Sequence, residues 1–143
     1  MLGYRRWSDD VHYFTLQPSE IDQHWSWIEP LLKTIDEAVW TTAEVRDALK
    51  SSEAQLWAFG DDPRGIVVTR LGKIGNTPSG LIWLAAGKSV EAFTHFLRAY
   101  IEPWFQSRGC RVVEIVGRRG WKKFLPDYRE LPQTTFAKEL LDE

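Results

Sequence analysis

The chain has 143 residues, 43% of them hydrophobic and 27% charged, and it contains one cysteine. This length and balance predict a single globular domain, residues 1–143, that folds without disulfide bonds. The net charge of −2 argues against binding of nucleic acid through an excess of positive charge. No apolar run is long enough for a membrane span, and the polar N-terminus does not look like a signal peptide, so we expect neither a membrane partner nor export.

The N-terminal part predicts one strand followed by two helices. Val11–Leu16 alternates in polarity as a strand does. A helix is expected to start near Pro18, because apolar residues then recur at helical spacing, and Pro30 is expected to kink or break it. Thr41 and Glu44 have the spacing of a capping box, which predicts the start of the second helix.

The middle of the chain predicts three strands. They are Gln55–Phe59, Gly65–Leu71 and Leu81–Ala86, and residues 75–80 are expected to form a loop between the last two. The third strand is apolar throughout, which predicts that both of its faces are covered.

The C-terminal part predicts a long helix from Ser89 to Ser107, with a kink near Pro103. A strand at Val112–Val116, a short helix at Trp121–Leu125 and a strand near Thr134–Lys138 are expected to follow. The whole order is β, α, α, β, β, β, α, β, α, β. It predicts an α/β fold with a central mixed sheet, helices on both faces, and two parallel strands joined by the long helix.

This order of elements resembles the GNAT (Gcn5-related N-acetyltransferase) family from Val11 to Leu140. In that family the fourth strand leads into a glycine-rich loop at a helix start, where backbone N–H groups hold the pyrophosphate of acetyl-CoA. The matching residues are Gly87, Lys88 and Ser89, in a shorter loop with one glycine instead of the family's Gln/Arg-x-x-Gly-x-Gly/Ala. The resemblance therefore implies acetyl-CoA binding by these three residues, and Arg118 is a further candidate for the phosphates.

The same resemblance singles out candidates for the chemistry. Glu114 lies on the strand beside the implied acyl site and is a candidate general base. The family often places a tyrosine acid seven residues after an asparagine that follows this strand. If Arg118 takes the place of that asparagine, the acid position falls on Leu125, which cannot donate a proton. Tyr128, beyond Pro126, is a poor substitute.

Simpler interpretations of these residues stay open. Gly87–Ser89 would also serve as a plain strand-to-helix turn, and Glu114 as an exposed strand carboxylate. Arg118 is part of a basic stretch that would equally be solvated or meet an acidic protein surface. The histidines lie on different predicted elements, so no metal site is expected. The tryptophans of the first helical region would line an acceptor pocket, dock a partner or pack in the core; they are Trp25, Trp27 and Trp40.

Residues 116–140, VGRRGWKKFLPDYRELPQTTFAKEL, resemble a phage-encoded subgroup of this fold that includes internal virion proteins of T7-type phages. The resemblance implies a virion or assembly protein that is catalytically degenerate and needs no cofactor. Its partners would be other virion proteins or copies of itself, in the virion or the host cytoplasm. The alternative is an acetyl-CoA-dependent N-acetyltransferase. A fold alone does not decide between the two.

Overall fold

The computed structural model describes residues 3–7, 11–35, 40–60, 65–87, 89–116, 123–131 and 135–140. Within them, eight strands form one sheet in the order β1-β2-β3-β4-β5-β6-β8-β7. The strands are β1 (Gly3–Trp7), β2 (Val11–Leu16), β3 (Ala54–Phe59), β4 (Gly65–Ile74), β5 (Thr77–Ala86), β6 (Val112–Val116), β7 (Arg129–Leu131) and β8 (Thr135–Glu139). The helices are η1 (Pro18–Glu20), α1 (Ile21–Leu32), α2 (Thr42–Lys50), α3 (Val90–Phe96), η2 (Leu97–Ile101) and α4 (Glu102–Ser107).

The chain divides into two compact units. The first contains Met1–Val68 and Leu84–Ser89, and the second contains Thr69–Trp83 and Val90–Glu143. Strands β4 and β5 therefore contribute residues to both units. A single domain stays a prediction.

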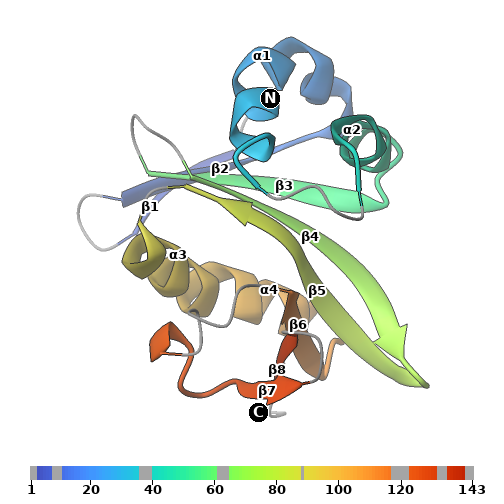
Figure 1. Cartoon of the computed structure of the whole chain (residues 1–143), viewed down its shortest axis with the longest axis vertical. Coiled ribbons are helices and arrows are strands. Elements are labelled where there is room, and N and C mark those ends of the chain that lie inside the picture. Colours follow the sequence, from blue (N-terminus) through green and yellow to red (C-terminus); the bar gives the residue numbers. More distant parts are fainter. Residues whose placement is uncertain are drawn as a thin grey trace. The chain divides into compact units, whose positions relative to one another are not determined.

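In the first unit, α1 and α2 lie together on one side of β2 and β3 (Figure 1). The side chains that α1 buries are those at the predicted helical spacing: Ile21, Trp25, Ile28 and Leu32. The helix is not broken at Pro30, because this exposed proline falls in its last turn and Lys33 closes the end through a backbone bond to Glu29. Thr41 caps α2 as predicted, since its hydroxyl accepts the backbone N–H of Glu44 at 3.1 Å.

Strand β1 of the first unit was not predicted. It pairs antiparallel with β2, from Gly3 opposite Thr15 to Trp7 opposite Val11. Its sequence, GYRRW, has little apolar alternation. Such a strand is stabilised by pairing with its neighbour more than by a pattern of its own.

The loop predicted at residues 75–80 is wrong. The structure has a two-residue turn, Gly75 and Asn76, and both strands extend to it. Gly75 adopts a positive φ of 61°, which glycine accepts without strain. The Pro78 and Gly80 residues that suggested a loop therefore lie inside β5.

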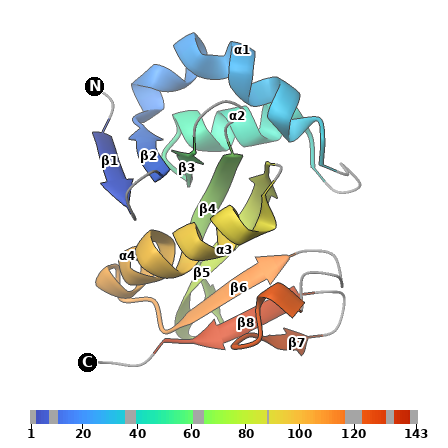
Figure 2. The ribbon, with the colours of Figure 1, turned by 90° about the vertical axis from the view of Figure 1, so that its left-hand side faces the viewer.

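In the second unit, the long predicted helix is present as three consecutive segments, α3, η2 and α4 (Figure 2). The middle segment is a π-helical turn, in which the Glu102 N–H bonds the Leu97 carbonyl five residues back. Pro103 follows at once. Its ring would clash with the carbonyl four residues back in a regular helix, and a widened turn moves that carbonyl away. The predicted kink is thus a π-helical turn just before the proline.

The parallel pair predicted across this helix is confirmed. Strand β6 pairs parallel with β5, from Ser79 opposite Val112 to Ile82 opposite Ile115. On its other side β6 pairs antiparallel with β8, and β8 with β7, a strand that was not predicted. The short helix predicted at residues 121–125 lies partly outside the described residues, and in the part described residues 123 and 124 form a 3-10 turn.

The two faces of β5 and β6 differ in the second unit. Gly80 lies against the helix, because a Cβ at this glycine would come within 2.3 Å of the Phe105 ring. Val113 and Ile115 are fully buried. Leu81 and Glu114, which alternate with these residues, point to the opposite face and are half-buried.

Candidate functional site

Gly87 directly follows β5, at the place where the resemblance implies a phosphate-binding loop. Its φ is +150°, and a Cβ on it would lie 3.0 Å from the Cα of Gly65 in the same unit. A side chain here would be strained in its backbone and crowded by a neighbouring backbone. Glycine is therefore required at this position, as it is wherever a backbone must be approached closely.

The close approach at Gly87 continues to the next strand. A Cβ on Gly65 would lie 2.4 Å from the ring of Phe59, a buried residue of β3. The ends of β3, β4 and β5 are thus packed through two glycines and one aromatic ring. Gly65 had no predicted role, although a glycine at the start of a β-branched strand was the available signal.

The rest of the predicted loop is described only in part. Ser89 is exposed and immediately precedes α3 in the chain. Lys88 and Arg118 lie outside the described residues, so their roles stay predictions.

Glu114 is placed on β6, opposite Leu81 of β5 and Ala137 of β8. Its side chain is half-buried, on the face opposite to the fully buried Val113 and Ile115. Within the described part of the chain it makes no hydrogen bond and no ion pair. A carboxylate in this state is available to accept a proton or to bind a cation.

The position expected for a proton donor holds a core residue. Leu125 is fully buried. Tyr128 is also buried, and its hydroxyl donates a 2.6 Å hydrogen bond to Glu102. Burial, followed by the charge of Glu102, raises the pKa of Tyr128 well above its ordinary value of 10.0. Tyr128 is therefore a structural hydrogen-bond donor and a poor acid, as the sequence analysis expected.

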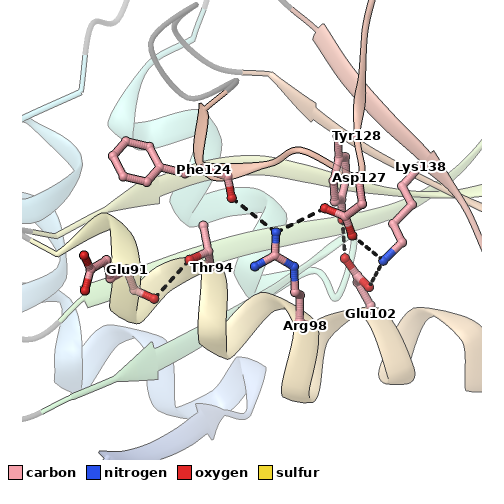
Figure 3. A network of polar contacts seen from close by, with 8 residues as sticks. All are labelled: Glu91, Thr94, Arg98, Glu102, Phe124, Asp127, Tyr128 and Lys138. Carbon is pink, nitrogen blue, oxygen red and sulfur yellow. Dashed lines mark hydrogen bonds and ion pairs between the residues drawn. The ribbon is translucent and has the colours of Figure 1, made fainter.

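Tyr128 belongs to a polar network in the second unit (Figure 3). Lys138 Nζ lies 2.8 Å from both Glu102 Oε1 and Asp127 Oδ2. Arg98 bonds Asp127 Oδ1 at 3.1 Å and the Phe124 carbonyl at 3.2 Å. Arg98 in the π-helical turn and Glu102, the first residue of α4, thus contact the segment that carries Asp127 and Tyr128.

This network shifts the pKa of two further groups. Burial alone would raise the pKa of Asp127, but hydrogen bonds from Lys138 and Arg98 outweigh it and the pKa is lowered. Burial alone would lower the pKa of Lys138, but its bonds to Asp127 and Glu102 raise it. This network was not predicted from the sequence. The available signal was Glu102, a charge within an apolar helical stripe next to a proline.

A surface groove of about 390 Å³ lies between α1 and α2 of the first unit. It is lined by Trp25, Glu29, Thr42, Ala43, Arg46, Asp47 and Lys50. The Arg46 guanidinium lies 5.1 Å from the centroid of the Trp25 ring, and Trp25 is itself buried. Trp40 is buried too, and the Trp27 indole donates to His24 at 3.0 Å. Of the three tryptophans considered for a pocket, Trp25 alone lines this groove.

No protein-family model matches the chain, and no curated protein matches it. Solved structures do. A GNAT family acetyltransferase from Brucella melitensis in complex with acetyl-CoA is 13% identical at a TM-score of 0.66, over 93% of this chain and 90% of that one. RimL, a ribosomal L7/L12 alpha-N-protein acetyltransferase, is 9% identical at a TM-score of 0.59, over 98% of this chain and 96% of that one.

An aminoglycoside acetyltransferase from an uncultured soil metagenomic sample, in complex with trehalose, is also similar. It is 9% identical at a TM-score of 0.58, over 83% of this chain and 85% of that one. At such identities the likeness concerns the fold. The chain has the α/β fold of GNAT acetyltransferases, and the predicted fold class is confirmed.

In the part of the chain described, no helix has both the length and the apolar character to cross a membrane.

Proposed function

We propose that the protein is an acetyl-CoA-dependent N-acyltransferase. The observation that carries the proposal is Gly87, whose positive φ and close approach to Gly65 occur just after β5 ends, three residues before α3 begins in the sequence. The resemblance places the phosphate-binding loop there, and backbone N–H groups at the start of a helix in general suit a pyrophosphate. A structural neighbour in complex with acetyl-CoA supports the choice of ligand.

Acetyl-CoA supplies an acetyl group activated as a thioester. In the transfer, the acceptor nitrogen forms a C–N bond to the acetyl carbon, the C–S bond breaks, and the nitrogen loses one proton. Glu114 is the residue proposed to accept that proton, since its half-buried carboxylate has no partner among the described residues. The departing thiolate takes its proton from water, because Leu125 stands at the acid position and Tyr128 is bound to Glu102.

The first test is calorimetric titration of the full chain with acetyl-CoA. Substitution of Gly87 would disturb the backbone, so Ser89→Glu is the better variant, since it adds a negative charge to the loop at an exposed position. We expect micromolar binding by the unchanged chain and about tenfold weaker binding by Ser89→Glu, which is about 1.4 kcal/mol. Ser19→Glu, at an exposed position of the same unit, is the matched control and should bind normally. No binding at millimolar acetyl-CoA would overturn the proposal.

We also propose a second candidate function, an interaction protein of a phage virion or its assembly, in which the GNAT fold is catalytically degenerate. The fully buried Leu125 at the acid position favours it. The structural neighbours described above do not bear on a virion role. Its test is pull-down with the tagged chain from phage-infected cells, together with sedimentation to detect self-association. Specific capture of virion proteins, with no acetyl-CoA binding, would support this candidate over the enzyme.

A further inference from the structure

Three residues form a row across β4, β5 and β6 of the second unit. The two-residue turn at Gly75 and Asn76 makes β4 and β5 an antiparallel hairpin, and counting back from this turn sets Arg70 opposite Leu81. Strand β6 in turn sets Glu114 opposite Leu81. Because neighbouring strands lie about 4.8 Å apart, the Cα atoms of Arg70 and Glu114 are about 10 Å from each other.

The position of Gly72 supports this register. A Cβ on Gly72 would have the Ser79 hydroxyl as its nearest neighbour, at 4.0 Å, as expected for residues directly opposite each other. Arg70 and Leu81 follow two residues further from the turn on each strand, so they share one face of the hairpin.

Trp83 completes this face. It lies two residues beyond Leu81 on β5, and therefore on the same side of the sheet. The Arg70 guanidinium lies 4.6 Å from the centroid of the Trp83 ring, within the range of a cation–π interaction. Both side chains are half-buried. The opposite side of β5 is the one that Gly80 presents to Phe105.

The two charges of the row have no counter-ions in the described part of the chain. Arg70 has its stack on Trp83 and no ion pair there, and Glu114 has neither an ion pair nor a hydrogen bond. Charged groups that are partly withdrawn from water are favoured when a partner of opposite charge compensates them. A positive and a negative group that flank an apolar surface are complementary to a ligand with both charges.

We propose that this face binds the acceptor of the transfer reaction, and that the acceptor is a small zwitterion of amino-acid size. Its carboxylate would bind Arg70, since a guanidinium pairs with a carboxylate through two parallel hydrogen bonds. Its ammonium group would lie at Glu114, and its carbon skeleton over Leu81 and Trp83. The ammonium would first release one proton to water, because only the neutral amine has a lone pair for the attack, and Glu114 would accept the second proton during the transfer. This inference rests on the proposed acyltransferase function and makes Arg70 a specificity-determining residue.

The spacing fits a ligand of this size. The Arg70 and Glu114 side chains start about 10 Å apart on the two outer strands of the row, with one apolar residue between them. Each side chain extends several ångströms, so the gap left between the two charged groups suits a short molecule with both charges. A longer polyamine without a carboxylate would leave Arg70 uncompensated.

The site is tested first by binding, without acetyl-CoA. The indole N–H signals of the ¹⁵N-labelled chain are recorded by NMR, and Trp83→Phe identifies the signal of Trp83. Glycine, alanine, lysine and phenylalanine are titrated in parallel with their carboxamides. We expect the Trp83 signal to shift with free amino acids and about tenfold weaker binding of the carboxamides, the loss expected when one charged hydrogen-bonded group is removed.

Two variants make the binding test specific. Arg70→Gln should abolish the preference for the carboxylate. Arg108→Gln is the matched control, because it removes another guanidinium stacked on a tryptophan, 5.2 Å from the Trp104 ring, and it should change nothing. If no amino acid shifts the Trp83 signal, or if Arg108→Gln has the same effect as Arg70→Gln, the inference is wrong whether or not acetyl-CoA binds.

Activity separates the inference from the proposed function. Release of free thiol from acetyl-CoA is followed with the same panel. Arg70→Gln should lower kcat/KM for amino acids at least tenfold, mainly through KM, and leave the carboxamides unaffected. If carboxamides are acetylated as well as amino acids are, the protein is an acyltransferase but the inference about Arg70 is wrong. If amino acids bind at Trp83 but acetyl-CoA does not bind to the chain, the binding site is supported and the acyltransferase proposal is wrong.

Discussion

The hydroxyl of Tyr128 donates a 2.6 Å hydrogen bond to the carboxylate of Glu102, and both side chains are buried. Lys138 neutralises the same carboxylate from its other oxygen. A buried acid is stabilised in this way only if its partners are retained, because a carboxylate left without them is costly. The contact ties the segment before β7 to the helix at its π-helical turn.

Replacement of Tyr128 with Phe is expected to lower the free energy of unfolding by about 1.5–3 kcal/mol, the range for a hydrogen bond to a charged group. Urea denaturation measures this, and a double-mutant cycle with Glu102→Gln isolates the pairwise part. A coupling energy near zero would contradict the structural role. If the protein is an acetyltransferase, the folded Tyr128→Phe variant should keep its rate within about threefold, whereas loss of a general acid costs about a hundredfold or more.

The stability of the chain is expected to fall at both ends of the pH range because of this network. The pKa of Asp127 is lowered from its ordinary value of 3.8, so its contribution is present above that value and is lost as the pH falls through the lower, folded value. The pKa of Lys138 is raised from 10.5, so its contribution is present below that value and is lost as the pH rises through the folded value. Buried Tyr128 adds to the alkaline loss, because the unfolded chain releases its proton first.

Urea midpoints measured across the pH range check this prediction. In the Asp127→Asn variant, the urea midpoint should fall less at acid pH than it does in the unchanged chain. Asp22→Asn is the control, because Asp22 also has a lowered pKa but owes it to Lys50 and Arg46 on the surface of the first unit. Exposed ion pairs of this kind contribute little to stability, whereas Asp127 also bonds Lys138, which is less exposed and is shared with the buried Glu102. If Asp22→Asn changes the loss of stability at acid pH and Asp127→Asn does not, Asp127 is not the source of that loss.

Substitution of Gly87 with Ala is expected to destabilise the chain by about 1–3 kcal/mol, the cost of a strained backbone conformation. The new Cβ would also lie 3.0 Å from Gly65 Cα. Gly60→Ala separates the two effects, since Gly60 has a positive φ of 80° but nothing within 4 Å of an added Cβ. Thermal unfolding should show the larger loss for Gly87→Ala. Equal losses would mean that the close approach to Gly65 is unimportant.

Substitution of Gly80 with Ala is expected to lower the free energy of unfolding by about 1–3 kcal/mol or more. The reason is overpacking, because the added Cβ would overlap the Phe105 ring. The double variant Gly80→Ala, Phe105→Leu should recover part of this loss by making space. Gly72→Ala on the same hairpin is the control, with its nearest contact at an ordinary 4.0 Å, and should be neutral or stabilising. Circular dichroism on heating compares the variants, and similar values for Gly80→Ala and Gly72→Ala would contradict the packing argument.

Much of the fold follows from local patterns in the sequence. The apolar spacing of α1, the Thr41 cap of α2 and the apolar run of β5 each depend on residues a few positions apart, so a single sequence reveals them. The order of these elements then indicates the parallel pairing of β5 with β6, which the structure confirms. Gly87 was singled out through the family resemblance, as part of a candidate phosphate-binding turn, and that binding role stays a prediction.

Other features depend on which segments pair or pack together, and the tertiary structure alone decided them. Strands β1 and β7 are present because β2 and β8 pair with them, while their own residues give little strand signal. The bond between Tyr128 and Glu102 joins residues 26 positions apart. The row of Arg70, Leu81 and Glu114 exists only once the register of three strands is set. The periodicity of a sequence indicates which side chains share a face of one helix or strand. Contacts between different elements depend on strand register and packing, and a local sequence pattern does not specify these.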